Sequence, residues 1–370
     1  MDYYIYTKNN IHKLDKVSNL TDEMLNYLVP IIEKGSHYFI DNANVEMCLL
    51  VINNKGMPII INHGKNEEQC VLTSFLVRYQ AYFKYFLTNK IEGKLVRNFL
   101  FMLLDKLVVF LQWCRLDRSV SLNNWLIHSN PKEIDKFSDD EWNQIIAFLS
   151  SYYPGYLIEY RGLDHVYTNK PSLEYFVKHG KIQDYRICYY RNPNAKKNNN
   201  YKNDLRLWKK TTLQVQEEPF HDANLITSLY RSLYVKKHSL HHVHNNAKWF
   251  ALTQDSGFVK YILVKQDGKV LGFFSFYTFN DKITPSYIGH DLGLNKDFGI
   301  YRLEWMYVIR LSEKHEKELA MSAGSDKFKK LRGGHPVKEY IGLYDRHLSF
   351  FKRRIFRFLW FLLDLIPTPK

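Results

Sequence analysis

The strongest constraint on the fold is a stretch in the last third of the chain, Ala320-Met-Ser-Ala-Gly-Ser-Asp-Lys-Phe-Lys-Lys-Leu-Arg-Gly-Gly334. It predicts a short apolar strand, a turn through small residues, and a basic helix that begins at Ser325. A helix entered through small residues exposes backbone N–H groups that attract an anion. The candidates for binding a donor phosphate or carboxylate here are Ser322, Gly324, Ser325, Lys327, Lys329 and Arg332. An ordinary helix cap with a solvated basic face explains the same residues.

The charge of the chain is strongly basic and unevenly distributed. The 370 residues carry a net charge of +14, and Lys327–Arg357 contains ten Lys or Arg residues against Glu339 and Asp345. Such a region favours acidic partners, namely a phosphorylated cofactor, RNA or an anionic membrane surface. The charge does not distinguish between them.

The cysteines and the chain start predict a cytoplasmic protein. Four cysteines lack Cys-x-x-Cys spacing and lie in apolar runs, which is typical of buried free thiols in a reducing compartment. The first residues lack the basic and apolar regions of a signal peptide. The longest apolar segment, Leu95–Cys114, contains Arg97, Asp105 and Lys106, so a buried amphipathic helix is expected rather than a membrane span.

The first half of the sequence alternates between helix and strand signals, which indicates a mixed sheet covered by helices. Its predicted helices are near Asp22–Lys34, at Gly93–Cys114, and after the capping box Ser138…Glu141. Its predicted strands are Val45–Asn53 and Pro58–Asn62 around a turn at Asn54-Lys55-Gly56, then Ser119–Leu122, Tyr156–Tyr160 and Lys181–Tyr190. The polar segment Asn192–Asn203 is predicted to be a mobile loop.

The second half gives clearer signals. Its predicted helices are Asp222–Lys236, Gly299–Lys317, the basic helix, and a terminal helix from Leu348. Its predicted strands are Phe258–Lys265 and Lys269–Phe279 around the hairpin turn Gln266-Asp-Gly-Lys269, then Lys282–Asp291, Leu319–Ser322 and Val337–Tyr344.

This order of helix, hairpin, strand, long helix, strand, helix and strand resembles a GNAT acyltransferase domain. The segments that resemble the GNAT branch related to Fem-type peptidoglycan aminoacyl transferases are Ser322–Gly333, Tyr344-Asp-Arg-His-Leu348, Tyr287–Asp291, Gly299–Leu303 and Leu233–His238. The resemblance covers about Asp222–Leu348. It implies an α/β protein with tandem GNAT-like domains at 1–203 and 204–348, each a mixed, mostly antiparallel sheet flanked by helices, and a terminal helix at 349–370.

The chain departs from that family in one segment. Most acetyl-CoA users carry Arg/Gln-x-x-Gly-x-Gly/Ala before the long helix, where backbone N–H groups hold the pyrophosphate. Here the segment is Leu292-Gly-Leu-Asn-Lys-Asp-Phe-Gly299, in which Gly293, Lys296 and Gly299 remain candidates for cradling phosphate. The resemblance implies an acyl-CoA or acyl carrier protein thioester as co-substrate, without a tightly bound cofactor. Fem-type relatives use aminoacyl-tRNA instead.

Acyl transfer to an amine needs a base, a group that stabilises the oxyanion, and an acid for the leaving group. The candidates for these catalytic roles are His290, Asp291, Glu304, Tyr287, Tyr301 and His347. Since neighbours in a strand face opposite sides, only one of His290 and Asp291 is expected to face the site. Arg302 and Arg346 are further candidates for binding a donor anion. The catalytic and anion-binding candidates also have structural explanations. They could form a hydrogen-bonded pair, an intrahelical ion pair or a clamp on the terminal helix.

Two further features have competing explanations. His238, His241, His242 and His244 have helical spacing suited to zinc, but no cysteine or carboxylate completes a site, so no metal is predicted. The terminal segment Phe350–Ile366 is basic first and apolar after. It fits an interfacial helix at an anionic membrane and, equally, a helix that packs on the first domain or in a dimer.

The sequence therefore predicts an N-acyltransferase that moves an acyl group from a thioester to an amine on a small molecule or peptide. The alternatives are an aminoacyl-tRNA-dependent transferase and a non-catalytic module at a membrane surface. The expected partners accordingly include an acyl carrier protein or tRNA, and an anionic membrane through the terminal helix. The expected location is the cytoplasm, with peripheral attachment at the inner membrane face as an alternative.

Overall fold

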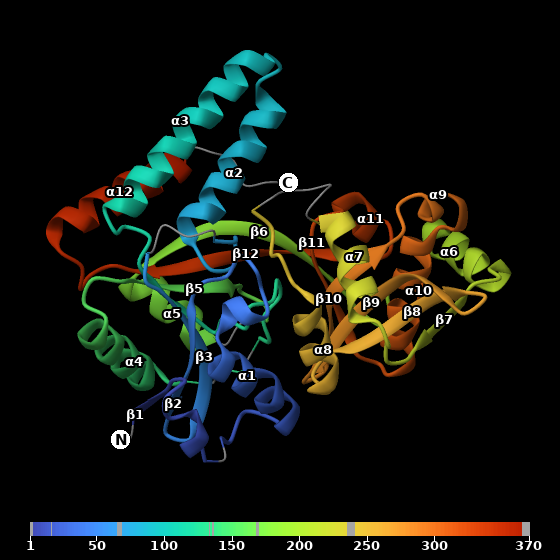
Figure 1. The fold of residues 1–370 in the computed structure, drawn as a ribbon, viewed down its shortest axis with the longest axis horizontal. Helices are drawn as coiled ribbons and strands as arrows, with labels where there is room; N and C mark the ends of the chain where they lie inside the picture. Colours follow the sequence, from blue (N-terminus) through green and yellow to red (C-terminus); the bar gives the residue numbers. More distant parts are fainter. Residues whose placement is uncertain are drawn as a thin grey trace. The chain divides into compact units, whose positions relative to one another are not determined.

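The computed structural model describes residues 3–15, 17–64, 69–132, 134, 137–167, 170–234 and 241–364. The chain divides into two compact units (Figure 1). The first unit consists of Met1–Tyr185, His241–His244 and Glu339–Pro369, and the second unit of Arg186–Leu240 and Asn245–Lys338. The boundary between the units thus lies before the expected residue 203, and the last strand returns the chain to the first unit.

The first unit is a mostly antiparallel sheet flanked by helices. Its helices are α1 (Asp22–Lys34), α2 (Phe75–Lys90), α3 (Lys94–Trp113), α4 (Asp139–Tyr152), α5 (Lys170–His179) and α12 (Phe350–Asp364), with 3-10 turns η1 (Ile11–Lys13) and η2 (Ser36–Tyr38). Its strands are β1 (Tyr3–Tyr6), β2 (Glu46–Ile52), β3 (Lys55–Asn62), β4 (Ser119–Leu122), β5 (Leu157–Leu163), the start of β6 (Lys181–Arg191) and the end of β12 (His335–Tyr344). The order β1-β2-β3-β4-β5-β12 is antiparallel except for the parallel pair β4–β5.

Local signals explain several of these elements. Asn53 and Asn54 have φ of 49° and 62°, a left-handed pair that suits a tight turn between β2 and β3. The turn therefore lies one residue earlier than predicted. The predicted capping box at Ser138 and Glu141 is present at the start of α4. Trp142 of that helix is fully buried in the core above the sheet.

The prediction of a buried helix at Leu95–Cys114 was wrong. In α3 only Val108 and Leu111 are buried, while Leu95 is 87% exposed and Trp113 is 73% exposed. Figure 1 shows α2 and α3 as a pair of helices that extends away from the sheet. A pair of helices that leaves the sheet has only its base against the core, which explains why most of α3 remains uncovered.

The terminal helix packs within the first unit. Phe356, Trp360 and Leu363 of α12 are buried in one apolar cluster with Val108 and Leu111 of α3. Of the two explanations left open for this segment, packing on the first domain therefore accounts for its inner face. This packing does not cover the outer face of α12, where the other aromatic residues of the helix are exposed.

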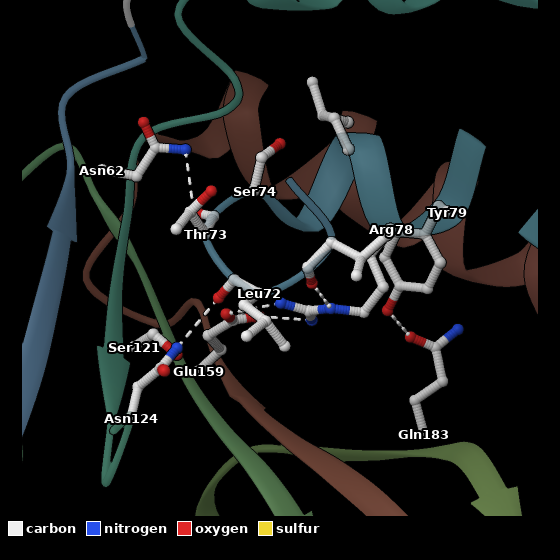
Figure 2. Close-up of polar contacts among 12 residues, drawn as sticks. Asn62, Leu72, Thr73, Ser74, Arg78, Tyr79, Ser121, Asn124, Glu159 and Gln183 are labelled. Carbon is white, nitrogen blue, oxygen red and sulfur yellow. Dashed lines mark hydrogen bonds and ion pairs between the residues drawn. The ribbon is translucent and has the colours of Figure 1, made fainter. Parts of the chain in front are cut away.

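A buried polar network fixes α2 to the sheet (Figure 2). Arg78 donates from both terminal nitrogens to the Glu159 carboxylate of β5, at 2.9 and 3.0 Å, and both side chains are buried. Asp117 accepts hydrogen bonds from Ser74 at 2.7 and 2.8 Å and from Asn62 at 3.2 Å. Burial raises the pKa of Asp117 to about 6, although these hydrogen bonds oppose the shift. These contacts are structural, because each carboxylate is held by neighbouring donors.

From α7 to β12 the second unit contains the predicted helices and strands in the predicted order, and it adds α6, β7, α8 and α9, which were not predicted. Its helices are α6 (Asn199–Lys210), α7 (Ala223–Tyr234), α8 (Ala247–Asp255), α9 (Leu294–Phe298), α10 (Ile300–Lys314) and α11 (Asp326–Lys330). Its strands are β7 (Gln214–Glu217), β8 (Lys260–Gln266), β9 (Lys269–Phe279), β10 (Lys282–His290), β11 (Glu318–Ala323), the end of β6 and the start of β12. The order β6-β11-β10-β9-β8-β7 is antiparallel except for the parallel pair β10–β11. The predicted α/β class with mostly antiparallel sheets is therefore confirmed.

The parallel strands β10 and β11 separate along their length. Within the described chain they pair only at Lys282 with Glu318 and at Ile283 with Leu319. A bulge follows between Pro285 and Ile288, where the Ser275 hydroxyl bonds the N–H and the carbonyl of Tyr287. The carboxyl ends of two parallel strands that separate are a common position for a ligand site.

The predicted mobile loop at Asn192–Asn203 was wrong in its second part. Asn198 caps α6 by accepting a hydrogen bond from the Tyr201 N–H at 3.1 Å. Tyr201 and Asp204 are buried on the inner face of this helix. The run of asparagines hid the helix start, because asparagine is favoured both in loops and at caps.

Candidate active site

A buried histidine–glutamate pair lies at the carboxyl end of β10. His290 Nδ1 is 3.2 Å from Glu304 Oε2 of α10, and the two side chains are almost completely buried. The second Glu304 oxygen, Oε1, is buried and has no hydrogen-bond partner among the described residues. Burial raises the pKa of Glu304 to about 7, and the contact with His290 only partly offsets the shift. The carboxyl group therefore changes its protonation state near neutral pH.

A glycine on the neighbouring strand makes room for this pair. A Cβ at Gly272 of β9 would lie 2.9 Å from Glu304 Oε1 and 3.0 Å from His290 Cβ. Gly272 is paired with His290 across the strands. The absence of a side chain at this position therefore allows the carboxylate to approach the sheet closely.

Aromatic residues surround the pair. The Tyr301 ring lies 5.9 Å from the His290 ring and 4.8 Å from the Phe328 ring of α11, between centroids. Tyr301 also hydrogen-bonds Ser325, and burial raises its pKa. Tyr234, at the end of α7, interacts electrostatically with Tyr301 and Glu304. Apolar walls of this kind exclude water, which strengthens the interaction between the charged groups inside.

The turn that links β11 to α11 is held from within. Lys329 is buried, and its Nζ donates to the carbonyls of Ser322 and Ala323 at 3.0 and 2.6 Å. Burial lowers the pKa of Lys329 to about 7. Ser322, Gly324 and Ser325 have φ of 59°, 77° and 52°, which is strained for serine. Lys329 thus fixes the turn instead of pointing outward toward a donor.

An acidic residue from α6 holds two of the predicted donor-binding arginines. Asp204 is buried and lies 2.6 Å from Arg302 Nε and 2.5 Å from Arg332 Nε. Arg332 is buried over the Phe328 ring, whereas the Arg302 side chain is 39% exposed. The Lys327 side chain is exposed, and Gly324 borders open space. Arg302 and Lys327 are therefore the predicted cations accessible to a phosphate beside this turn.

The segment 292–299 does not present the expected phosphate cradle. The N–H groups of Gly293 and Leu294 donate to the Asp291 carboxylate at 2.9 and 3.0 Å. The Gly299 N–H donates to the Asn295 carbonyl and the Tyr301 N–H to the Asn295 side chain. Since these donors are already used, a pyrophosphate at this position would have to displace them.

The structure separates several of the other predicted residues from the pair. As strand alternation predicts, His290 is buried while Asp291 is exposed and caps the following turn. Tyr287 packs against aromatic residues of α7 and α8, with Tyr230 and Phe250 at 6.0 and 5.5 Å. Tyr287 therefore packs against α7 and α8, whereas His290 contacts Glu304 of α10.

His347 and Arg346 belong to the first unit, not to the unit that contains His290. His347 Nε2 lies 2.8 Å from the Tyr156 carbonyl, and Arg346 donates to the Lys178 carbonyl at 3.3 Å. These contacts match the structural alternative, a clamp at the start of the terminal helix.

The predicted histidine group is only partly described. His238 lies outside the described residues, and no group of three or more metal-ligating side chains occurs within them. The carbonyls of His241 and His244 accept hydrogen bonds from Val71 and Asp41.

Sequence reasoning missed Asp204, Gly272 and Tyr234. Asp204 lay just after a segment interpreted as a loop, and Gly272 has no motif around it. Tyr234 lies in the segment Leu233–His238 but was not singled out as a site residue. The pairing of β9 with β10 places Gly272 beside the pair, and Tyr234 of α7 interacts with Glu304. Asp204 of α6 instead joins Arg302 and Arg332.

Comparison with family models and with curated proteins found no match. Among solved structures, a protein of unknown function from Bacteroides thetaiotaomicron is 7% identical with a TM-score of 0.48, covering 92% of this chain and 99% of that one. A tandem GNAT protein from the clavulanic acid biosynthesis pathway is 7% identical with a TM-score of 0.40, covering 92% and 98%. FemX is 10% identical with a TM-score of 0.43, covering 60% and 79%. At these scores none of them assigns a function to this chain.

Proposed function

We propose that the second unit is a GNAT-like N-acyltransferase that moves an acyl group from a thioester, on CoA or a carrier protein, to an amine. The observation that carries the proposal is the buried contact between His290 and Glu304 at the end of β10, where this strand has left β11. A proton acceptor held in a buried pair at this point suits the deprotonation of an amine.

In the proposed reaction the amine nitrogen forms a bond to the thioester carbon, the carbon–sulfur bond breaks, and the thiolate leaves. His290 accepts the amine proton at Nε2, since Nδ1 is bound by Glu304. Glu304 is a positioning residue that fixes the ring and stabilises the imidazolium as it forms. Tyr301, whose ring lies beside that of His290, supplies the proton for the leaving thiolate.

The segment before the long helix bears on which donor the site accepts. The N–H groups of Gly293, Leu294 and Gly299 are engaged within the chain, which favours a donor that is not held there by its pyrophosphate. A thioester on a carrier protein, or a CoA held by Arg302 and Lys327, meets that condition. The net charge of +14 favours one second candidate, an aminoacyl-tRNA-dependent transferase.

Thermal stabilisation with separate donors tests these functions. We would compare acetyl-CoA, a long-chain acyl-CoA, an acylated carrier protein and bulk aminoacyl-tRNA, because selective binding raises apparent stability. A shift with a thioester, followed by release of free thiol when an amine is added, is the expected result. A shift with tRNA alone would replace the proposal with the tRNA-dependent function. A lack of any shift would favour a non-catalytic module.

The His290→Ala variant tests the mechanism. Loss of the base should lower turnover by about 100-fold or more, while the fold is retained. Thiol release would be compared at equal protein concentration, with the melting temperature as the control for folding. Unchanged turnover in a folded variant would exclude His290 from the mechanism.

A further inference from the structure

The outer face of α3 carries exposed apolar side chains along its length, interrupted near its middle by the exposed Lys106. These apolar side chains are Leu95, Phe99, Met102, Val109, Phe110 and Trp113, here called the apolar stripe. They recur at helical spacing, so they lie on one face of the helix. Soluble surfaces seldom expose so many large apolar residues on one face of a helix, and such a face marks an interaction site.

The neighbouring helix α12 exposes a second aromatic face. Phe350, Phe351, Phe358 and Phe361 are exposed, although the opposite face of the helix is buried in the same cluster as α3. Arg354 lies between these residues at helical spacing, and its guanidinium is 5.0 Å from the Phe350 ring. Both helices therefore turn an inner face to the shared core and leave an outer face uncovered.

The charges around these faces indicate what covers them. Lys94 and Lys106 accompany the apolar stripe, and Arg354 and Arg357 accompany the phenylalanines of α12. The single acid of α3, Asp105, is 2.6 Å from Lys84, which neutralises it. A second copy of this chain would bring like charges together across such an interface, whereas an anionic lipid surface would attract them.

We propose that the apolar stripe of α3, with the outer face of α12, docks the protein on an anionic lipid bilayer. Rings and aliphatic side chains enter the boundary between headgroups and acyl chains, and the lysines and arginines contact lipid phosphates. Within the described chain no helix is long and apolar enough to cross a membrane, so the contact is with one leaflet. The sequence placed membrane contact on the terminal helix alone, whereas the structure adds α3 as a larger apolar surface.

Co-sedimentation with vesicles tests this proposal. The full chain is expected to sediment with phosphatidylglycerol–phosphatidylcholine vesicles and much less with pure phosphatidylcholine. The double variant F99Q/F110Q should lower the partition coefficient by about tenfold or more. The double variant R354Q/R357Q should weaken binding to the anionic vesicles only. A matched control is V166S/V177S, which changes two exposed apolar residues elsewhere in the first unit and should leave binding unchanged.

Two further measurements distinguish the outcomes. The exposed Trp113 should shift its fluorescence to the blue on vesicle addition, and Trp113→Phe should remove that shift. Light scattering without lipid gives the oligomeric state. A dimer that F99Q/F110Q dissociates would overturn the proposal in favour of self-association. Equal binding by wild-type and F99Q/F110Q, or no binding to either vesicle, would also overturn it.

Discussion

The substitution Glu304→Gln should make the second unit more stable at neutral pH and leave it unchanged in acid. Glu304 has no exposed surface, and burial raises its pKa from 4.5 to about 7. Between these values the folded protein keeps a proton that the unfolded chain releases, so the free energy of unfolding falls as pH rises. One pKa unit corresponds to about 1.4 kcal/mol, which gives a total loss of about 3 kcal/mol. Glutamine retains the size and the hydrogen bond to His290 but does not titrate.

The assay is urea unfolding of wild-type and E304Q from pH 4 to pH 8, followed by tryptophan fluorescence. Subtracting the two curves removes the titrations common to both proteins. The free energy of unfolding of E304Q should exceed that of wild-type by close to zero at pH 4 and by about 3 kcal/mol at pH 8. Glu218→Gln is a control of opposite sign: burial would raise the Glu218 pKa, but hydrogen bonds from Lys265 and Gln216 outweigh it and lower the pKa. A flat difference for E304Q, or a variant less stable at pH 8, would refute the reasoning.

Three other substitutions test the buried His290–Glu304 pair and the buried polar network that fixes α2 to the sheet. Gly272→Ala should lower the free energy of unfolding by about 1–3 kcal/mol, because the new Cβ would lie 2.9 Å from Glu304 Oε1; an unchanged urea midpoint would contradict this. Arg78→Met should lower the free energy of unfolding by about 3–5 kcal/mol, because it removes the guanidinium bound to the buried Glu159 carboxylate; R78M/E159Q should recover much of that loss in a double-mutant cycle. Asp117→Asn should gain stability relative to wild-type as pH rises from about 4 to 6, because burial raises the Asp117 pKa to about 6; a difference curve that still rises above pH 7 would be inconsistent with this assignment.

The candidate site illustrates how far residue patterns alone can lead. Strand alternation correctly predicted that His290 and Asp291 would face opposite ways. The predicted long helix also placed Tyr301 and Glu304 in its first turns, where the structure has them. The role of Lys329 and Arg332 was not predictable in this way. Whether a cation meets solvent or a buried carbonyl depends on what packs over it, and Asp204 and the turn carbonyls come from other segments.

The sequence by itself determined the order of the main strands and helices from α7 to β12, because hydrophobic periodicity, caps and tight turns act over a few residues. It also determined the charge excess and the residue types available for acid–base chemistry. Three features were decided by the tertiary structure alone. They are the division between the units within β6 and β12, the placement of Gly272 against Glu304, and the exposure of α3. Contacts between distant segments depend on strand pairing and on which helix faces are covered, and neither is encoded in a local pattern.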